Sequence, residues 1–173
     1  AILQYIPGVF HAAAPDGTVW LAETARILIF DKQTPDQVRR LTPEIPPDRI
    51  VFAGEHAFCF SSSAGIWGAD LDEEGNITAQ LLMNYTNSGV DPLNSALLGT
   101  FGEEAFLLGE ATAEGRSAPV LYRASEDVSL ASLSVLEVAF SFNPEKGGSA
   151  VGFTTAIVEY NKAHPDRRIL TKD

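Results

Sequence analysis

Hydrophobic and polar residues alternate over short stretches of this chain, and turn-forming residues separate the stretches. Alternation with a period of two, bounded by Gly, Pro, Asn, Asp and Ser, is typical of short β-strands. The pattern predicts strands at 9–13, 18–22, 26–30, 37–41, 49–53, 56–60, 65–69, 77–84, 96–101, 105–109, 120–123, 128–133, 136–142, 150–154, 157–160 and 168–171. No window favours a helix, and residues 128–140 fit strands better. The chain is therefore predicted to be all-β.

The stretch from Gly54 to Asp70 recurs along the chain. It reads as two short strands joined by a Ser/Gly turn, and related stretches begin at Gly17, Gly102 and Gly148, at intervals of 37 to 48 residues. A period of about 40–50 residues with four short strands is typical of a β-propeller. One four-stranded sheet cannot bury its own faces, whereas blades packed around an axis bury both.

The repeat predicts one domain with blades at about 1–42, 49–84, 94–134 and 135–173. Two arrangements stay open: a closed propeller of four blades, or part of a larger propeller completed by further chain or by a second copy. Because most propellers have more than four blades, the second is slightly favoured. The same short strands also permit a β-sandwich, which is the competing fold.

The sequence resembles β-propeller repeat proteins in general, and one part resembles the gluconolactonase-like propellers. The resemblance rests on three runs: Leu-Asn-Ser-Ala at 93–96, Ala-Phe-Leu-Leu-Gly at 105–109 and Val-Leu-Tyr-Arg at 120–123. In that family an Asn at the start of an inner strand binds a divalent metal. The resemblance thus implies a Ca²⁺ or Zn²⁺ ligand at Asn94. The family's acidic ligands in other blades correspond here to apolar residues near Ile6 and Val138.

Composition narrows the set of partners. The 173 residues are 45% hydrophobic and 20% charged, which is typical of a globular domain. The net charge of −11 argues against binding nucleic acid or an anionic membrane, since both need clustered basic residues. The partner classes that remain are a protein and a small molecule, and the protein partner includes a second copy of this chain.

Three features bear on processing and compartment. Cys59 is the single cysteine, so no disulfide forms within the chain. The chain opens without Met or a targeting signal, and we expect a processed chain or a fragment. Sequons at Asn76 and Asn84 would be glycosylated in a eukaryotic secretory route, which is compatible with a secreted protein.

The candidate functional residues lie at strand ends and in loops. His11 and His56 are predicted near one end of a central channel, although their spacing matches no zinc motif. Asn87 and Asp91 belong to the irregular linker 85–92, and Glu110 opens the long loop 110–118. Rigid scaffolds commonly bind through such loops.

Three hypotheses for function follow, and the sequence does not decide whether the chain is an enzyme. The first is a non-catalytic propeller module that binds a protein or a ligand through its loops. The alternative is a metal-dependent, lactonase-like hydrolase acting on a small molecule at the central channel, with Asn94 as one ligand. The third is a partial propeller that works only after assembly.

Overall fold

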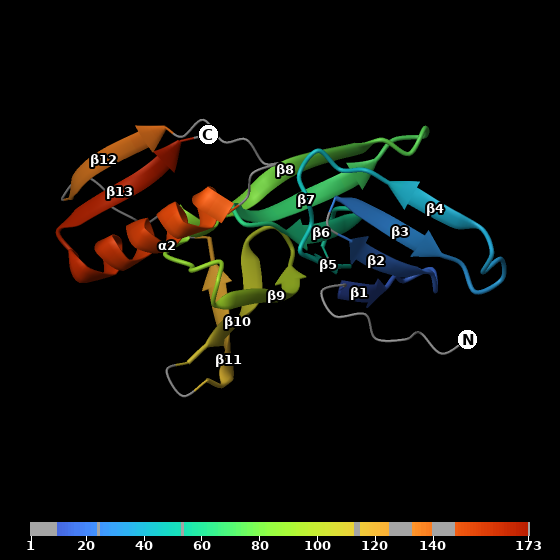
Figure 1. The fold of residues 1–173 in the computed structure, drawn as a ribbon, viewed down its shortest axis with the longest axis horizontal. Coiled ribbons are helices and arrows are strands. Elements are labelled where there is room, and N and C mark those ends of the chain that lie inside the picture. Colours follow the sequence, from blue (N-terminus) through green and yellow to red (C-terminus); the bar gives the residue numbers. More distant parts are fainter. Residues whose placement is uncertain are drawn as a thin grey trace.

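The computed structural model of the chain describes residues 10–23, 25–52, 54–112, 115–124, 133–139 and 148–172. These residues form thirteen strands and two helices (Figure 1). The prediction of a mostly β fold is confirmed. Most of the strands belong to three antiparallel sheets that follow one another along the chain.

The first two sheets have the same topology. In each, four strands lie side by side in chain order, and every neighbouring pair is antiparallel. The first sheet contains β1 (Phe10–Ala13), β2 (Val19–Glu23), β3 (Arg26–Phe30) and β4 (Val38–Leu41). The second sheet contains β5 (Arg49–Val51), β6 (Phe58–Ser61), β7 (Gly65–Leu71) and β8 (Ile77–Asn84).

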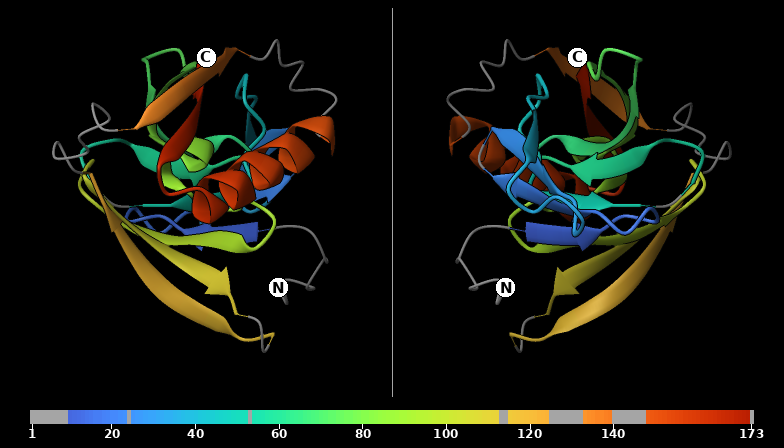
Figure 2. Two further views of the ribbon diagram at one scale, coloured as in Figure 1. Left: turned by 90° about the vertical axis from the view of Figure 1, so that its left-hand side faces the viewer. Right: turned by 90° about the vertical axis from the view of Figure 1, so that its right-hand side faces the viewer.

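The third sheet follows a short helix, α1 (Tyr85–Ser88), which Asn84 caps with its side chain. Its described strands are β9 (Ser95–Phe101), β10 (Ala105–Ala111) and β11 (Ser117–Arg123), again antiparallel and in chain order. The predicted loop 110–118 is therefore shorter than expected, because strand pairing continues to Ala111 and resumes at Ser117. The β10–β11 hairpin projects from the body of the molecule (Figures 1 and 2).

A turn with a glycine in the left-handed conformation recurs in these three sheets. Gly17, Gly54 and Gly102 each lie between the first and second strand of a sheet, with φ of 85°, 88° and 67°. That left-handed conformation is accessible to glycine at little cost. A Cβ at Gly54 would lie 3.6 Å from the Cα of Gly102, so the turns of the second and third sheets touch.

Two apolar clusters hold the three sheets together. The first strands of the sheets are neighbours, since β1 contacts β5 and β5 contacts β9. Between the first and second sheets, Trp20 packs against Phe58 with ring centroids 5.1 Å apart. Between the second and third, Ile66 packs with Leu97 and Phe106.

The end of the chain departs from the prediction. Gly148–Ala163 forms helix α2, so the strands predicted at 150–154 and 157–160 are wrong, and Gly148 begins a helix rather than a repeat. The helix connects β12 (Ser134–Ala139) to β13 (Arg167–Lys172), which pair in parallel. We call β12, α2 and β13 the C-terminal unit.

The helix has a physical explanation in the spacing of its buried residues. Thr154, Ile157, Val158 and Asn161 are all buried. They are separated by three, one and three positions, which places them on one face of a helix. The predicted strand at 128–133 lies almost wholly outside the described residues.

Candidate functional site

The most connected polar side chain among the predicted site residues is His56. It lies in the turn between β5 and β6, with Nδ1 2.8 Å from Asp70 Oδ2 and Nε2 3.0 Å from Glu103 Oε1. Asp70 is on β7, whereas Glu103 is in the turn between β9 and β10. The ring therefore links the second sheet to the third, and we call this group the histidine clasp.

The second sheet is shaped to hold the ring in this position. Asp70 Oδ1 accepts a hydrogen bond from the backbone N–H of Ala57 at 2.9 Å, which fixes the carboxylate beside the turn. Gly68, two residues earlier on β7, leaves the space that the ring fills. A Cβ at Gly68 would lie 2.2 Å from His56 Cδ2, closer than any real contact. Only glycine at this position accommodates the observed ring.

Two carboxylates favour the charged form of the imidazole. The hydrogen bond to Asp70 is the largest cause that raises the pKa of His56, partial burial opposes it, and Glu103 adds to the rise. The same hydrogen bond lowers the pKa of Asp70. The His56 side chain is 10% exposed, whereas those of Asp70 and Glu103 are 54% and 44% exposed. The clasp thus places a largely buried imidazole, whose pKa is raised, between two carboxylates that are about half exposed.

Gln80 on β8 gives the neutral ring a different partner. Its Nε2 lies 3.2 Å from His56 Nε2. A protonated ring donates from Nε2 to Glu103, while a neutral ring that donates from Nδ1 to Asp70 can accept there from the Gln80 amide. Loss of one proton therefore exchanges a contact with the third sheet for one within the second sheet.

The geometry favours a structural role for His56 over a catalytic one. A general base needs an unprotonated nitrogen directed at a substrate proton, and here both nitrogens have partners within the protein. The two carboxylates lie on opposite nitrogens, so they do not converge on one point. Among the described residues, no group of three or more His, Cys, Asp or Glu side chains is arranged to hold a metal ion.

Three other predicted site residues come together beside the C-terminal unit. Asn87 Oδ1 accepts from the backbone N–H of Thr171 at 2.9 Å. Asp91 Oδ1 accepts from the hydroxyl of Thr155 at 2.9 Å, and its Oδ2 accepts from the amide of Asn94 at 2.7 Å. The linker 85–92 is therefore no free loop: it joins β8 and β9 to α2 and β13.

The remaining predicted residues lie elsewhere. His11 is on β1 opposite Leu21, and its side chain is exposed. Glu110, near the end of β10, accepts a hydrogen bond from the hydroxyl of Tyr122. Burial, and then this carboxylate, raises the pKa of Tyr122. The pair strengthens the side of the hairpin that faces the second sheet.

Sequence reasoning found His56 but missed its partners. Asp70, Gln80 and Glu103 come from three different segments. Even Asp70, the partner nearest in sequence, is 14 positions from His56. The sequence contained one usable signal: glycine at position 68, within an apolar strand, where it weakens the strand unless another group approaches closely.

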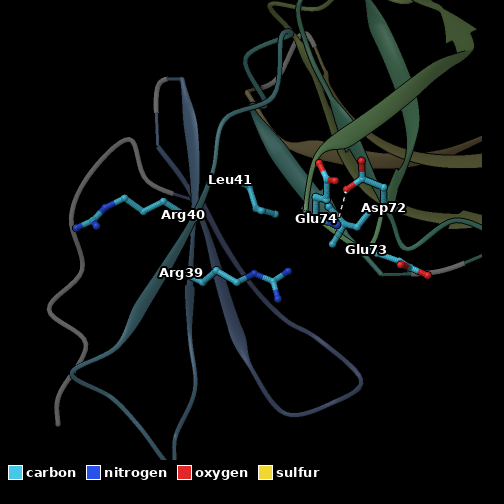
Figure 3. A pocket seen from close by; sticks show the side chains of 8 residues that line it. Arg39, Arg40, Leu41, Asp72, Glu73 and Glu74 are labelled. Atoms are coloured by element: carbon cyan, nitrogen blue, oxygen red, sulfur yellow. Dashed lines mark hydrogen bonds between the residues drawn. The ribbon is translucent and has the colours of Figure 1, made fainter.

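A cleft lies between the first two sheets. Its volume is about 380 Å³, and it is lined by β4 and by the turn between β7 and β8. Figure 3 shows Arg39 extending toward the acidic residues Asp72, Glu73 and Glu74, while Arg40 points away. The cleft therefore brings basic residues of the first sheet near acidic residues of the second.

The outward side of the third sheet carries three exposed large apolar side chains. Leu98, Phe101 and Leu121 are 49%, 63% and 46% exposed. Leu121 pairs with Leu107, and Phe101 pairs with Ala105, so these side chains share one side of the sheet. A contiguous exposed apolar side of a sheet is typical of an interaction surface.

Comparison with protein-family models, with curated proteins and with solved structures gave no match. Neither described helix has the length and apolar character that crossing a membrane requires.

Proposed function

We propose that this chain is a non-catalytic binding module of the β-propeller type. Three consecutive antiparallel meanders support this proposal, as do their first strands β1, β5 and β9, which are neighbours in that order. Blades of a propeller are such meanders, and their first strands surround the central axis. The glycine turn shared by the three sheets is a further point in favour.

The binding surface in this proposal is the outward side of the third sheet. The observation that carries it is the exposure of Leu98 and Phe101 on β9 together with Leu121 on the projecting β10–β11 hairpin of the same sheet. The polar candidates serve the fold instead: His56 links two sheets, while Asn87 and Asp91 hold the C-terminal unit. The Asn94 amide donates to Asp91, which supports a structural role for that pair as well.

Site-specific photo-crosslinking tests the proposal. A photoreactive phenylalanine analogue replaces Leu121, and the matched control replaces Lys32, an exposed residue in the turn between β3 and β4. In an extract of the native cells, we expect position 121 to give one discrete crosslinked product and position 32 to give none. Equal, diffuse labelling from both positions would contradict the proposal.

A further inference from the structure

The two sides of each sheet have different neighbours. In the second sheet, Phe58 and Phe60 pack in the cluster shared with the first sheet. Cys59 lies between these two residues in the strand and faces the third sheet, where Thr100 Oγ1 lies 4.0 Å from its Sγ. We call the side of a sheet that faces the sheet before it in the chain its preceding side, and the opposite side its following side. Both sides of the second sheet are covered.

In the part of the chain that the structure describes, no element covers the preceding side of the first sheet. Strand register places one apolar set on that side, with Val19 opposite Phe30, Leu21 opposite Leu28, and Phe30 opposite Val38. All five side chains are partly exposed. Their strand neighbours Trp20, Ala22, Ile27 and Ile29 are buried against the second sheet.

Among the described residues, none covers the apolar side chains on the following side of the third sheet, and Leu98, Phe101 and Leu121 stay exposed there. Leu97, Phe106 and Leu108 are buried toward the second sheet. The opposite side holds Leu98, Phe101, Leu107, Pro119 and Leu121. A bulge between Leu107 and Leu108 turns Leu98 toward this side, and its side chain fills the space above Gly109.

We propose that a second copy of this chain docks here, with the preceding side of its first sheet against the following side of the third sheet. At each internal junction, the following side of one sheet packs against the preceding side of the next sheet. The preceding side of the first sheet and the following side of the third sheet are left without such a partner among the described residues. Docking a second copy would continue the packing that already joins the three sheets. The inference rests on the proposed function, and it names the partner for that same surface.

The predicted contact is heterologous, because different surfaces of the two copies meet. Such contacts close into a ring when the rotation allows it and otherwise continue into a chain. The charge of −11 on each copy makes two copies repel one another. Added salt screens that repulsion and leaves the apolar contact in place, so association should strengthen with ionic strength.

A complementation experiment tests the proposal. Leu121→Asp disables the third-sheet surface and Val38→Asp disables the first-sheet surface. Of the strands that the structure describes, β11 and β4 are outermost in their sheets, where a substitution disturbs the sheet less than at its centre. Sedimentation velocity over a range of concentrations should show self-association of the wild type. Each variant alone should associate at least about tenfold more weakly, and an equimolar mixture should form a one-to-one heterodimer.

Two controls separate this result from misfolding. Leu136→Asp, on exposed β12, should leave association unchanged. Should Val38→Asp fail to fold by circular dichroism, Leu28→Ser on the neighbouring strand takes its place. A wild type that stays monomeric at all concentrations, or variants that do not complement one another, would overturn the inference.

The outcomes also distinguish this inference from the proposed function. A monomeric chain that crosslinks from position 121 to a different protein refutes the second copy and leaves the binding module standing. A monomeric chain with no discrete crosslink refutes both. Self-association with complementation, together with a crosslinked homodimer from position 121, supports both.

Discussion

Gly68 and His56 should be energetically coupled, and a double-mutant cycle measures the coupling. In Gly68→Ala the new Cβ would lie 2.2 Å from Cδ2, 2.4 Å from Nε2 and 2.8 Å from Cγ of the His56 ring. No arrangement of the ring in its present plane relieves three such contacts. The ring must leave, and its hydrogen bonds to Asp70 and Glu103 are then lost.

The size of the effect follows from the exposure of the two carboxylates. A buried hydrogen bond to a charged group contributes about 1.5–3 kcal/mol. The side chains of Asp70 and Glu103 are 54% and 44% exposed, so water compensates for much of each lost hydrogen bond. About 1 kcal/mol per bond then remains. Alanine recovers about 0.5 kcal/mol over glycine within a strand. The free energy of unfolding should therefore fall by about 1.5 kcal/mol, the sum of these general values.

The same substitution should behave differently without the ring. In a His56→Ala background, the three atoms that lie nearest to the new Cβ are gone, and Gly68→Ala should stabilise the protein by about 0.5 kcal/mol. The difference between the two backgrounds gives a coupling energy of about 2 kcal/mol. Urea unfolding near pH 6, followed by tryptophan fluorescence, measures all four proteins of the cycle.

Gly65→Ala is the matched control for this cycle. Its Cβ would lie 2.0 Å from the backbone oxygen of Met83, so its cost should be the same with or without His56. If Gly68→Ala costs as much in the His56→Ala background as in the wild type, the ring is not what occupies the space above Gly68, and the reasoning fails.

Three further predictions concern the clasp, a turn and the C-terminal unit. The pKa of His56 is raised on folding and that of Asp70 is lowered. The stability difference between wild type and His56→Ala should thus be largest at about pH 4–6.5, falling as pH rises through the folded pKa of His56 and as it drops through that of Asp70; a flat difference in pH-dependent urea titrations would contradict this. Gly102→Ala, at φ 67°, should lower the free energy of unfolding by about 1–2 kcal/mol in urea titrations, whereas Gly99→Ala, with open space around it, should be neutral; equal costs would refute the turn argument. Asn87→Ala should speed hydrogen exchange in α2 while the three sheets keep their protection, because it removes the contacts to β13; unchanged exchange in α2 would show that the linker does not hold the unit.

Local rules predicted the first two sheets well. The strands Arg26–Phe30 and Ile77–Asn84 have the predicted bounds, and other described strands of these sheets differ by a few residues at their ends. Alternation and turn glycines are local signals, and antiparallel meanders are built from neighbours in sequence. Nothing beyond each hairpin was needed to predict them.

The C-terminal unit shows where such rules fail. Helix α2 contains two Val, two Thr and one Ile among its sixteen residues, and these residue types are typical of strands. The helical spacing of its buried face was present in the sequence, but packing against α1 and β13 decided the outcome. Parallel pairing of β12 with β13 is also non-local, because a whole helix separates the two strands.

The clasp could be predicted only in part, since its partners are distant in sequence. A histidine beside a glycine turn is visible, but which carboxylates reach it depends on how the second sheet meets the third. The prediction of His56 near a channel end stays a prediction. The linker residues were chosen as a free loop, whereas the structure uses Asn87 and Asp91 to attach the C-terminal unit.

Polar contacts at the junctions give the stack an order that apolar packing alone does not. Apolar sides of sheets attract one another without much regard to identity, so any open side could pair with any other. The contact of His56 with Glu103 is satisfied only when the third sheet follows the second. At the other junction, Arg39 extends toward the acidic turn that begins at Asp72, and these opposite charges favour the second sheet beside the first.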